Sequence, residues 1–86
     1  MQTETQINLI RLCDLYASKR GVTHWRVSRL AHGDGQFFKR QKDNKGLTLR
    51  VAAKVLQWFS DNWPADLEWP ADIPRPEMTT DAKGAP

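Results

Sequence analysis

One cysteine among 86 residues, Cys13, excludes an internal disulfide, and neither histidine has the thiol partners that a zinc site needs. No apolar run is long enough to cross a bilayer, and the polar N-terminus lacks the basic-then-apolar order of a secretory signal. We therefore expect a cytoplasmic protein that makes no contact with a membrane. We also expect Cys13 to be buried in a helix as a small apolar residue.

Catalytic patterns are missing as well. The chain has no Ser/His/Asp or Cys/His set, no pair of acids in a core segment and no glycine-rich loop followed by Lys-Ser/Thr. The segment Gly33-Asp34-Gly35 is too short to hold a phosphate group. These absences argue against an enzyme, and we expect neither a cofactor nor a bound metal.

Charge is divided unevenly along the chain. Residues 19–54 hold ten Lys or Arg against two Asp, a net charge of +8, although the whole chain carries only +3. The segment from Trp63 to the C-terminus carries −3. Eight net charges in 36 residues exceed what an ordinary solvated surface holds, so we expect a face that binds a polyanion. The split also predicts that the acidic tail competes with that ligand for the basic face.

Apolar residues at helical spacing predict an all-α fold, a compact four-helix domain in residues 1–63. The first helix is expected at about residues 4–19, after a capping box that starts at Thr3. The second helix is expected over residues 23–31, because Gly33-Asp34-Gly35 is a strong turn signal.

The second half of this domain is expected to hold two further helices. Residues 36–44 predict a short third helix, with Gly46 in the left-handed position just after its end. The fourth helix is expected to begin at the cap Thr48 and to end near residues 62–63, because Pro64 cannot continue it.

Several side chains are expected in the core. Val27, Leu30 and Ala31 share one apolar stripe of the second helix. Phe37 and Phe38 are adjacent, so we expect one of them in the core and the other against a neighbouring element. Two more residues of the second helix are ambiguous. Trp25 is expected either to pack against the first or fourth helix or to stack on sugar and thymine methyl groups, and packing is the favoured interpretation. His24 is expected to be partly buried.

The tail repeats the letters Trp-Pro-Ala-Asp at residues 63–66 and 69–72, and more prolines follow. We expect residues 64–76 to be extended rather than helical. Because exposed tryptophan is costly, folding back onto the core is the favoured arrangement, and docking onto a partner is the alternative. Residues 77–86 are expected to be disordered.

Residues 21–30, Gly-Val-Thr-His-Trp-Arg-Val-Ser-Arg-Leu, have the pattern of the turn and second helix of a helix-turn-helix. Gly21 suits the positive φ of such a turn, and Thr23 can cap the helix that follows. The side chains predicted to lie outside have the chemistry to contact base edges and phosphates. These are Thr23, His24, Trp25, Arg26, Ser28 and Arg29.

With Ala17 four residues before the glycine, this segment resembles the helix-turn-helix of the lactose-repressor family, Ala-x-x-x-Gly-Val-Ser-x-x-Thr-Val-Ser-Arg. The match covers about fourteen residues. It departs at Arg26, where the family has threonine, and at Arg20, where the family usually has an apolar residue. Carried over by position, the resemblance implies contacts to DNA from Thr23, His24, Trp25 and Arg29, and core positions for Val22, Val27 and Leu30.

The chain as a whole also resembles the phage repressors of the Cro and lambda class. In that alignment Ala31 and Gly35 take the alanine and glycine places of the motif, and residues 36–44 become the recognition helix. Gln41 then falls where the pattern favours an aliphatic residue. The residues facing DNA would be Gln36, Lys39, Arg40 and Asn44, with Lys42 adding charge. Both alignments stay open at this point.

Both resemblances imply the same function: sequence-specific binding of double-stranded DNA by a transcriptional regulator of phage or mobile-element type. Such readers commonly act as two-fold dimers, and the fourth helix with the Trp/Pro tail is the expected dimer contact. The alternative is a protein-interaction adaptor or inhibitor anchored by Trp25, Trp58, Trp63 and Trp69. Either activity leaves room for contact with a protein such as the transcription machinery.

Overall fold

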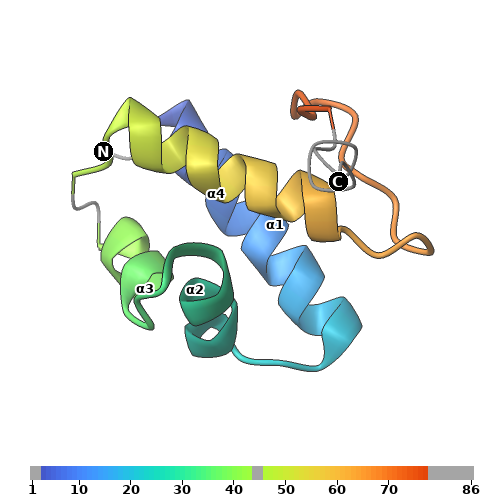
Figure 1. Ribbon diagram of the computed structural model, residues 1–86, viewed down its shortest axis with the longest axis horizontal. Coiled ribbons are helices and arrows are strands. Elements are labelled where there is room, and N and C mark those ends of the chain that lie inside the picture. Colours follow the sequence, from blue (N-terminus) through green and yellow to red (C-terminus); the bar gives the residue numbers. More distant parts are fainter. Residues whose placement is uncertain (1–2, 44–45, 78–86) are drawn as a thin grey trace, which may run out of the picture.

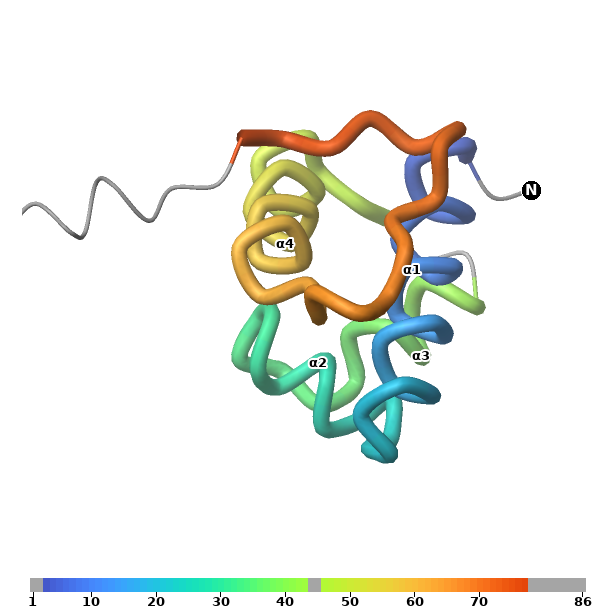
Figure 2. The backbone as a smooth tube through the Cα atoms, turned by 90° about the vertical axis from the view of Figure 1, so that its right-hand side faces the viewer, coloured from blue at the N-terminus to red at the C-terminus, as the bar shows by residue number. Residues whose placement is uncertain are grey.

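The structure, a computed structural model, describes residues 3–43 and 46–77. The described residues form four helices and no strand, as the predicted all-α class requires. Figure 2 shows α4 above α2, α1 running from top to bottom beside α3, and the segment after α4 climbing past α1 and crossing over the top. In chain order the helices are α1 (Glu4–Arg20), α2 (His24–His32), α3 (Phe37–Lys42) and α4 (Leu49–Asn62) (Figure 1).

The helix starts obey the capping rules that their sequences predict. At α1 the backbone N–H of Gln6 donates to Thr3 Oγ1 at 3.2 Å, and the backbone N–H of Thr3 donates to Gln6 Oε1 at 2.9 Å. This reciprocal pair is the capping box expected there. Thr23 and Thr48 cap α2 and α4, each accepting from the N–H three residues ahead, at 3.1 and 3.2 Å. Local sequence therefore fixes where three of the helices begin.

Two glycines close the first two helices in the left-handed conformation. Gly21 has φ 69° and donates its N–H to Ala17 O, and Gly33 has φ 81° and donates to Arg29 O. An L side chain is strained at such φ values, so glycine is the natural residue at both ends. The turn expected at Gly21 is confirmed.

The prediction for the end of α3 is wrong. The helix begins at Phe37 and stops at Lys42, short of the predicted residue 44, and Asp43 closes it with φ −85°. The Asp43 N–H bonds to Lys39 O at 3.1 Å, so no left-handed residue is needed. Gly46 lies beyond the helix end. Asn44 lies outside the described residues.

The core is a cluster of aromatic rings around Phe59 of α4, which is fully buried. Its ring centroid lies 5.3–6.1 Å from those of Phe38, Tyr16, Trp58 and Trp63. Edge-to-face and tilted contacts of this kind stabilise a core beyond the area they bury. Rings from α1, α3 and α4 thus meet at one residue.

Two predictions for core residues need correction. Phe37 and Phe38 are both buried, at 3% and 0% exposure, because α3 is packed against both α1 and α2. Leu30 is 49% exposed and is not a core residue. The buried face of α2 is centred on Val27 and Ala31, as predicted, and it turns Leu30 outward.

Gln41 occupies its unusual inward position because a second glutamine meets it. Gln6 Nε2 on α1 donates to Gln41 Oε1 on α3 at 2.8 Å, and both side chains are buried. A buried amide must be hydrogen-bonded to avoid a large desolvation penalty. The aliphatic residue that the phage-repressor pattern favours is therefore replaced by a polar pair that links α1 to α3.

Residues 63–77, which we call the strap, fold back on the helices. Each Trp-Pro-Ala-Asp copy forms the same turn. Trp63 Nε1 donates to Leu67 O at 2.7 Å, and Trp69 Nε1 donates to Ile73 O at 2.7 Å. In both turns the backbone N–H of the residue at the end donates to the proline carbonyl, at 3.1 and 3.2 Å. The sequence repeat is thus a structural repeat.

The strap runs antiparallel to α1 and is attached to it by ion pairs. Asp66 meets Lys19 at 2.9 Å, and Asp72 meets Arg11 at 2.7 Å. Hydrogen bonds from these cations lower the pKa of both carboxyl groups. All four side chains are solvent-accessible, so the pairs position the strap more than they stabilise it. Apolar anchorage comes from Ile73, which is 3% exposed.

The far end of the strap attaches to α4. Arg75 Nη2 donates to Ser60 O at 2.8 Å, and the same guanidinium lies over the Trp69 ring at 5.0 Å. Asp66 of the strap therefore engages Lys19, which is one of the cations of the basic segment, whereas Asp72 engages Arg11, which lies outside that segment. Competition of the tail with a ligand for the basic face stays a prediction. Residues 78–86 of the tail predicted to be disordered lie outside the described residues.

Cys13 is fully buried in α1, as predicted. Burial is the largest cause that raises the pKa of its thiol from 9.0 to about 12, since a thiolate would be desolvated there. Between these two values the unfolded chain loses the proton and the folded chain keeps it. Folding is therefore disfavoured by rising pH in this range.

We expect this linkage to be measurable in alkaline solution. Between about pH 9 and pH 12 the thiol should reduce the free energy of unfolding by about 1.4 kcal/mol for each pH unit. Urea unfolding of the natural chain and of Cys13→Ala over this range isolates the effect. The variant should show a shallower decline than the natural chain, and parallel curves would contradict the assignment.

Candidate nucleic-acid interface

The outer face of α2 carries two arginines between a tryptophan and a leucine. Trp25 is 52% exposed and Leu30 is 49% exposed, and Arg26 and Arg29 are exposed beside them. These four residues line one shallow depression. The guanidinium carbon of Arg29 lies over the Trp25 ring, 5.5 Å from its centroid, which is a cation–π contact.

Trp25 rests on the turn between α2 and α3. A Cβ atom added at Gly35 would lie 2.1 Å from Trp25 Nε1, so the absence of a side chain at Gly35 makes room for the indole. Gly33 and Gly35 thus serve different purposes, one for a positive φ and the other for close approach. The prediction that Trp25 packs against the first or fourth helix is not what the structure shows, because about half of the ring faces solvent.

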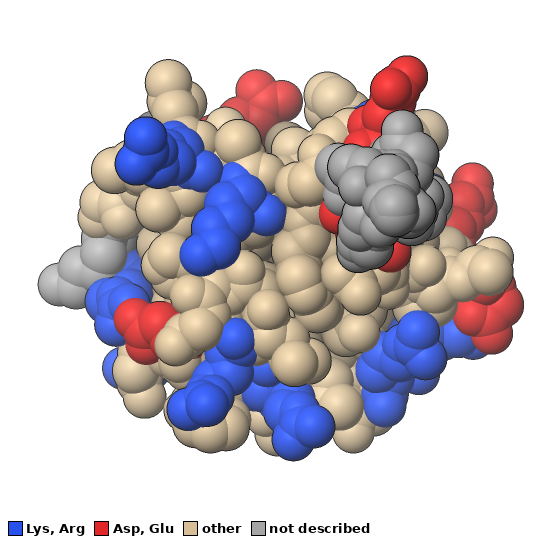
Figure 3. Space-filling model, in the orientation of Figure 1, with Lys and Arg blue, Asp and Glu red and all other residues tan. Residues whose placement is uncertain are grey.

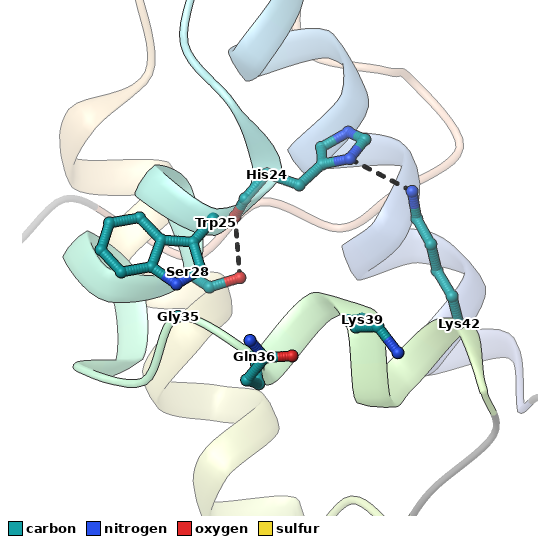
Figure 4. Close-up of a pocket in the computed structure, with 7 residues that line it drawn as sticks. All are labelled: His24, Trp25, Ser28, Gly35, Gln36, Lys39 and Lys42. Carbon is teal, nitrogen blue, oxygen red and sulfur yellow. Dashed lines mark hydrogen bonds between the residues drawn. The ribbon is translucent and has the colours of Figure 1, made fainter.

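A hollow of about 250 Å³ opens on the surface where α2 meets α3 (Figure 4). The indole of Trp25 stands above Gly35 on one side, and lysines of α3 stand on the other. The lining combines aromatic, amide and cationic groups, a mixture that suits a phosphate or a base edge. The residues are His24, Trp25, Ser28, Gly35, Gln36, Lys39 and Lys42.

Ser28 does not face outward as predicted. It is fully buried, and its hydroxyl donates to His24 O at 2.8 Å and accepts from the backbone N–H of Phe38 at 3.1 Å. Position 28 lies on the α2 face that meets α3, so the side chain joins the two helices. We therefore remove Ser28 from the residues that could reach a ligand.

His24 links three helices at the start of α2. Its Nε2 lies 2.7 Å from Asp14 Oδ1 on α1, and its Nδ1 lies 3.2 Å from Lys42 Nζ on α3. A lysine ammonium can only donate, so Nδ1 accepts and the proton sits on Nε2, facing Asp14. His24 is partly buried, as predicted, and it fixes the first turn of α2 against both neighbours.

The predicted cations of α3 are engaged within the protein. Arg40 pairs with Asp34, and this hydrogen bond is the main cause that lowers the pKa of the Asp34 carboxyl group. Lys39 lies 3.7 Å from Asp43, and Lys42 contacts His24. Gln36 is exposed at the start of α3.

The cations of α2 differ from those of α3. Arg26 and Arg29 form no ion pair with any residue that the structure describes. Thr23, just before them, is exposed but uses its hydroxyl as the cap of α2. The face of α2 therefore offers two guanidinium groups whose donors are open to an outside acceptor.

The charges form two regions on the molecular surface. Figure 3 shows Lys and Arg along the lower and left margins of this view, over α2, α3 and the start of α4. Asp and Glu lie mostly toward the upper and right margins, on the side of the strap. The basic segment found in the sequence is thus gathered mainly on one side of the fold.

Most residues of this surface can be predicted from the sequence, and two of them, Leu30 and Gly35, cannot. Leu30 was assigned to the core, and no signal in the apolar stripe distinguishes it from Val27. Gly35 was assigned to a turn, and its contact with Trp25 depends on a side-chain position that spacing alone does not give. Thr23, Trp25, Arg26 and Arg29 do lie on or beside one exposed face.

Neither a family model nor a curated protein nor a solved structure matches the chain. Within residues 3–43 and 46–77 no group of three or more His, Cys, Asp or Glu side chains is placed to hold a metal ion. The helices in the same residues are too short or too polar to cross a membrane.

Proposed function

We propose that the protein is a sequence-specific reader of double-stranded DNA, a transcriptional regulator of phage or mobile-element type that acts in the cytoplasm. The observation that carries this proposal is the exposed face of α2, with Arg26 and Arg29 beside Trp25 and without ion pairs to described residues. The guanidinium group of arginine can donate two hydrogen bonds to the N7 and O6 atoms of guanine in the major groove. This groove is wide enough to hold one α-helix. We therefore assign α2 as the recognition helix, as the lactose-repressor resemblance implies.

Residues of α3 have a supporting part in this proposal. Lys39 and Lys42 stand at the hollow between α2 and α3, where they would neutralise phosphates beside the groove. Their ion-pair and hydrogen-bond partners make them poorer candidates for base contacts, and Arg40 is tied to Asp34. Phosphate contacts make binding fall as salt rises.

Dimerisation also belongs to the proposal, on a smaller surface than the sequence indicates. The strap attaches to the C-terminal part of α4 and leaves Leu49, at the N-terminal end of that helix, 86% exposed. We place the contact between two copies at this end of α4, and dimeric readers of this kind bind half-sites about 34 Å apart.

Selection from random duplexes at two salt concentrations tests the proposed function. We expect enrichment of a short palindrome and an affinity that drops steeply between the two concentrations. Sequencing of the bound pool would give the operator. Binding without any enriched sequence would contradict a specific reader and leave only charge attraction.

Two arginine variants distinguish the two helices. Arg29→Gln should weaken binding to the selected operator by about 1–3 kcal/mol and relax the preference at one base pair, because it removes a bidentate contact. Arg40→Gln makes the same charge change on α3 and serves as the matched control. It should weaken binding less, and equally for all sequences. A larger effect of Arg40→Gln would move the recognition helix to α3.

The adaptor function has less support in the structure. Trp58 and Trp63 pack around Phe59, and Trp69 packs edge-on against Trp63 with Arg75 over its face. Of the four tryptophans, Trp25 alone is among the exposed large apolar residues. An adaptor that needs several tryptophan anchors would have to give up contacts that the fold already uses.

A further inference from the structure

The stacked pair of Trp25 and Arg29 calls for an explanation beyond general DNA binding. A large apolar ring that is 52% exposed is unusual on a small domain, and Leu30 extends the apolar surface beside it. Neither residue contributes to the aromatic cluster around Phe59. The exposed face of α2 thus combines a cation with apolar surface on both sides.

The indole is held in place on its inner side. Gly35 lies so close under the ring that even a methyl group there would collide with Nε1, Cδ1 and Cε2. The next turn of the same helix carries Arg29, whose guanidinium lies over the ring at 5.5 Å. A guanidinium that stacks on an aromatic face keeps its N–H edges free for bonding in its own plane.

We propose that Trp25 is a positioning and specificity residue, which orients Arg29 toward a guanine and itself contacts the methyl group of a neighbouring thymine. This inference rests on the proposed function and adds to it the base step that α2 reads. Thymine alone presents a methyl group in the major groove, and guanine alone presents the N7 and O6 acceptor pair. A stacked cation flanked by apolar surface matches these two neighbours together.

Base analogues in the selected operator test the two contacts separately. Replacing a guanine with 7-deazaguanine removes only the N7 acceptor and should weaken binding by about tenfold at the position that Arg29 reads. Replacing the adjacent thymine with uracil removes only the methyl group and should weaken binding by about fourfold. The analogues are placed one at a time across the half-site.

Protein variants then show whether Trp25 couples the two effects. Trp25→Ala should abolish the uracil effect and reduce the 7-deazaguanine effect, because Arg29 loses the surface that orients it. Trp25→Phe keeps a ring and should retain most of the 7-deazaguanine effect. Arg50→Gln changes an exposed arginine at the start of α4, outside the face of α2, and should leave both analogue effects unchanged. Circular dichroism confirms that each variant is folded.

The outcomes separate this inference from the proposed function. If the natural chain selects an operator and Trp25→Ala keeps both analogue effects, Trp25 neither orients Arg29 nor contacts a methyl group, and the inference is wrong. If the pool yields no operator, the proposed function itself fails, and the inference fails with it. Loss of the uracil effect and a smaller 7-deazaguanine effect in Trp25→Ala, with both effects retained in Arg50→Gln, would support it.

Discussion

A chain that ends at Trp63 is expected to lose about 4 kcal/mol or more of folding free energy, and so to unfold at a much lower urea concentration than the natural chain. The strap buries Ile73 against α1 and α4 and places Trp69 beside Trp63. Without it, apolar surface of both helices would face water. Small domains have net stabilities of only about 5–15 kcal/mol, so a loss of this size removes a large part of the net stability.

Urea unfolding followed by circular dichroism would measure this effect. The matched control is the full chain with Asp66→Asn and Asp72→Asn, which removes both ion pairs of the strap and keeps its apolar contacts. Because those pairs are exposed, the control should unfold close to the natural chain. A truncated chain with an unchanged urea midpoint would show that the strap is not part of the folding unit.

Phe59→Ala is expected to cost about 3–5 kcal/mol, since it leaves a cavity at the meeting point of four other rings. Phe59 is fully buried, and its neighbours come from α1, α3, α4 and the start of the strap. The helices that carry those rings are fixed by their own hydrogen bonds, so the surrounding structure cannot collapse fully into the space.

Thermal and urea unfolding give the size of the loss. Lys54→Ala on the same helix is the matched control, because that side chain is exposed and should change stability by less than about 0.5 kcal/mol. Phe59→Leu should lie between the two, since it refills most of the cavity. Similar losses for Phe59→Ala and Lys54→Ala would mean that the aromatic cluster is not the centre of the core.

Local signals in the sequence predict much of the fold. The capping box at Thr3, the left-handed Gly21 and the caps Thr23 and Thr48 each depend on a few adjacent residues, and the structure has all of them. The end of α3 is different, because a plain turn at Asp43 is as effective as the predicted glycine. Local rules state which residues suit a helix end, but they do not choose between two acceptable ends.

The errors in the site arise from tertiary packing. Ser28 and Leu30 are both close to the edge of the apolar stripe, and the position of α3 decides that the small polar residue is buried and the leucine is exposed. The contact between Trp25 and Gly35 likewise depends on how α3 follows α2. Phe37 joins Phe38 inside because a six-residue helix between two others has little solvent-facing surface.

The duplicated turn of the strap also sets the spacing of its two ion pairs along α1. Its two aspartates are six residues apart, and the cations that they meet, Lys19 and Arg11, are eight residues apart. Eight helical residues span about 12 Å, so the strap advances by about 2 Å per residue, well below the rise of an extended chain. The turn in each copy takes up the excess length. The six-residue spacing of the two aspartates in the strap therefore matches the eight-residue spacing of their cations on α1. One residue inserted between the copies would move one aspartate away from its cation.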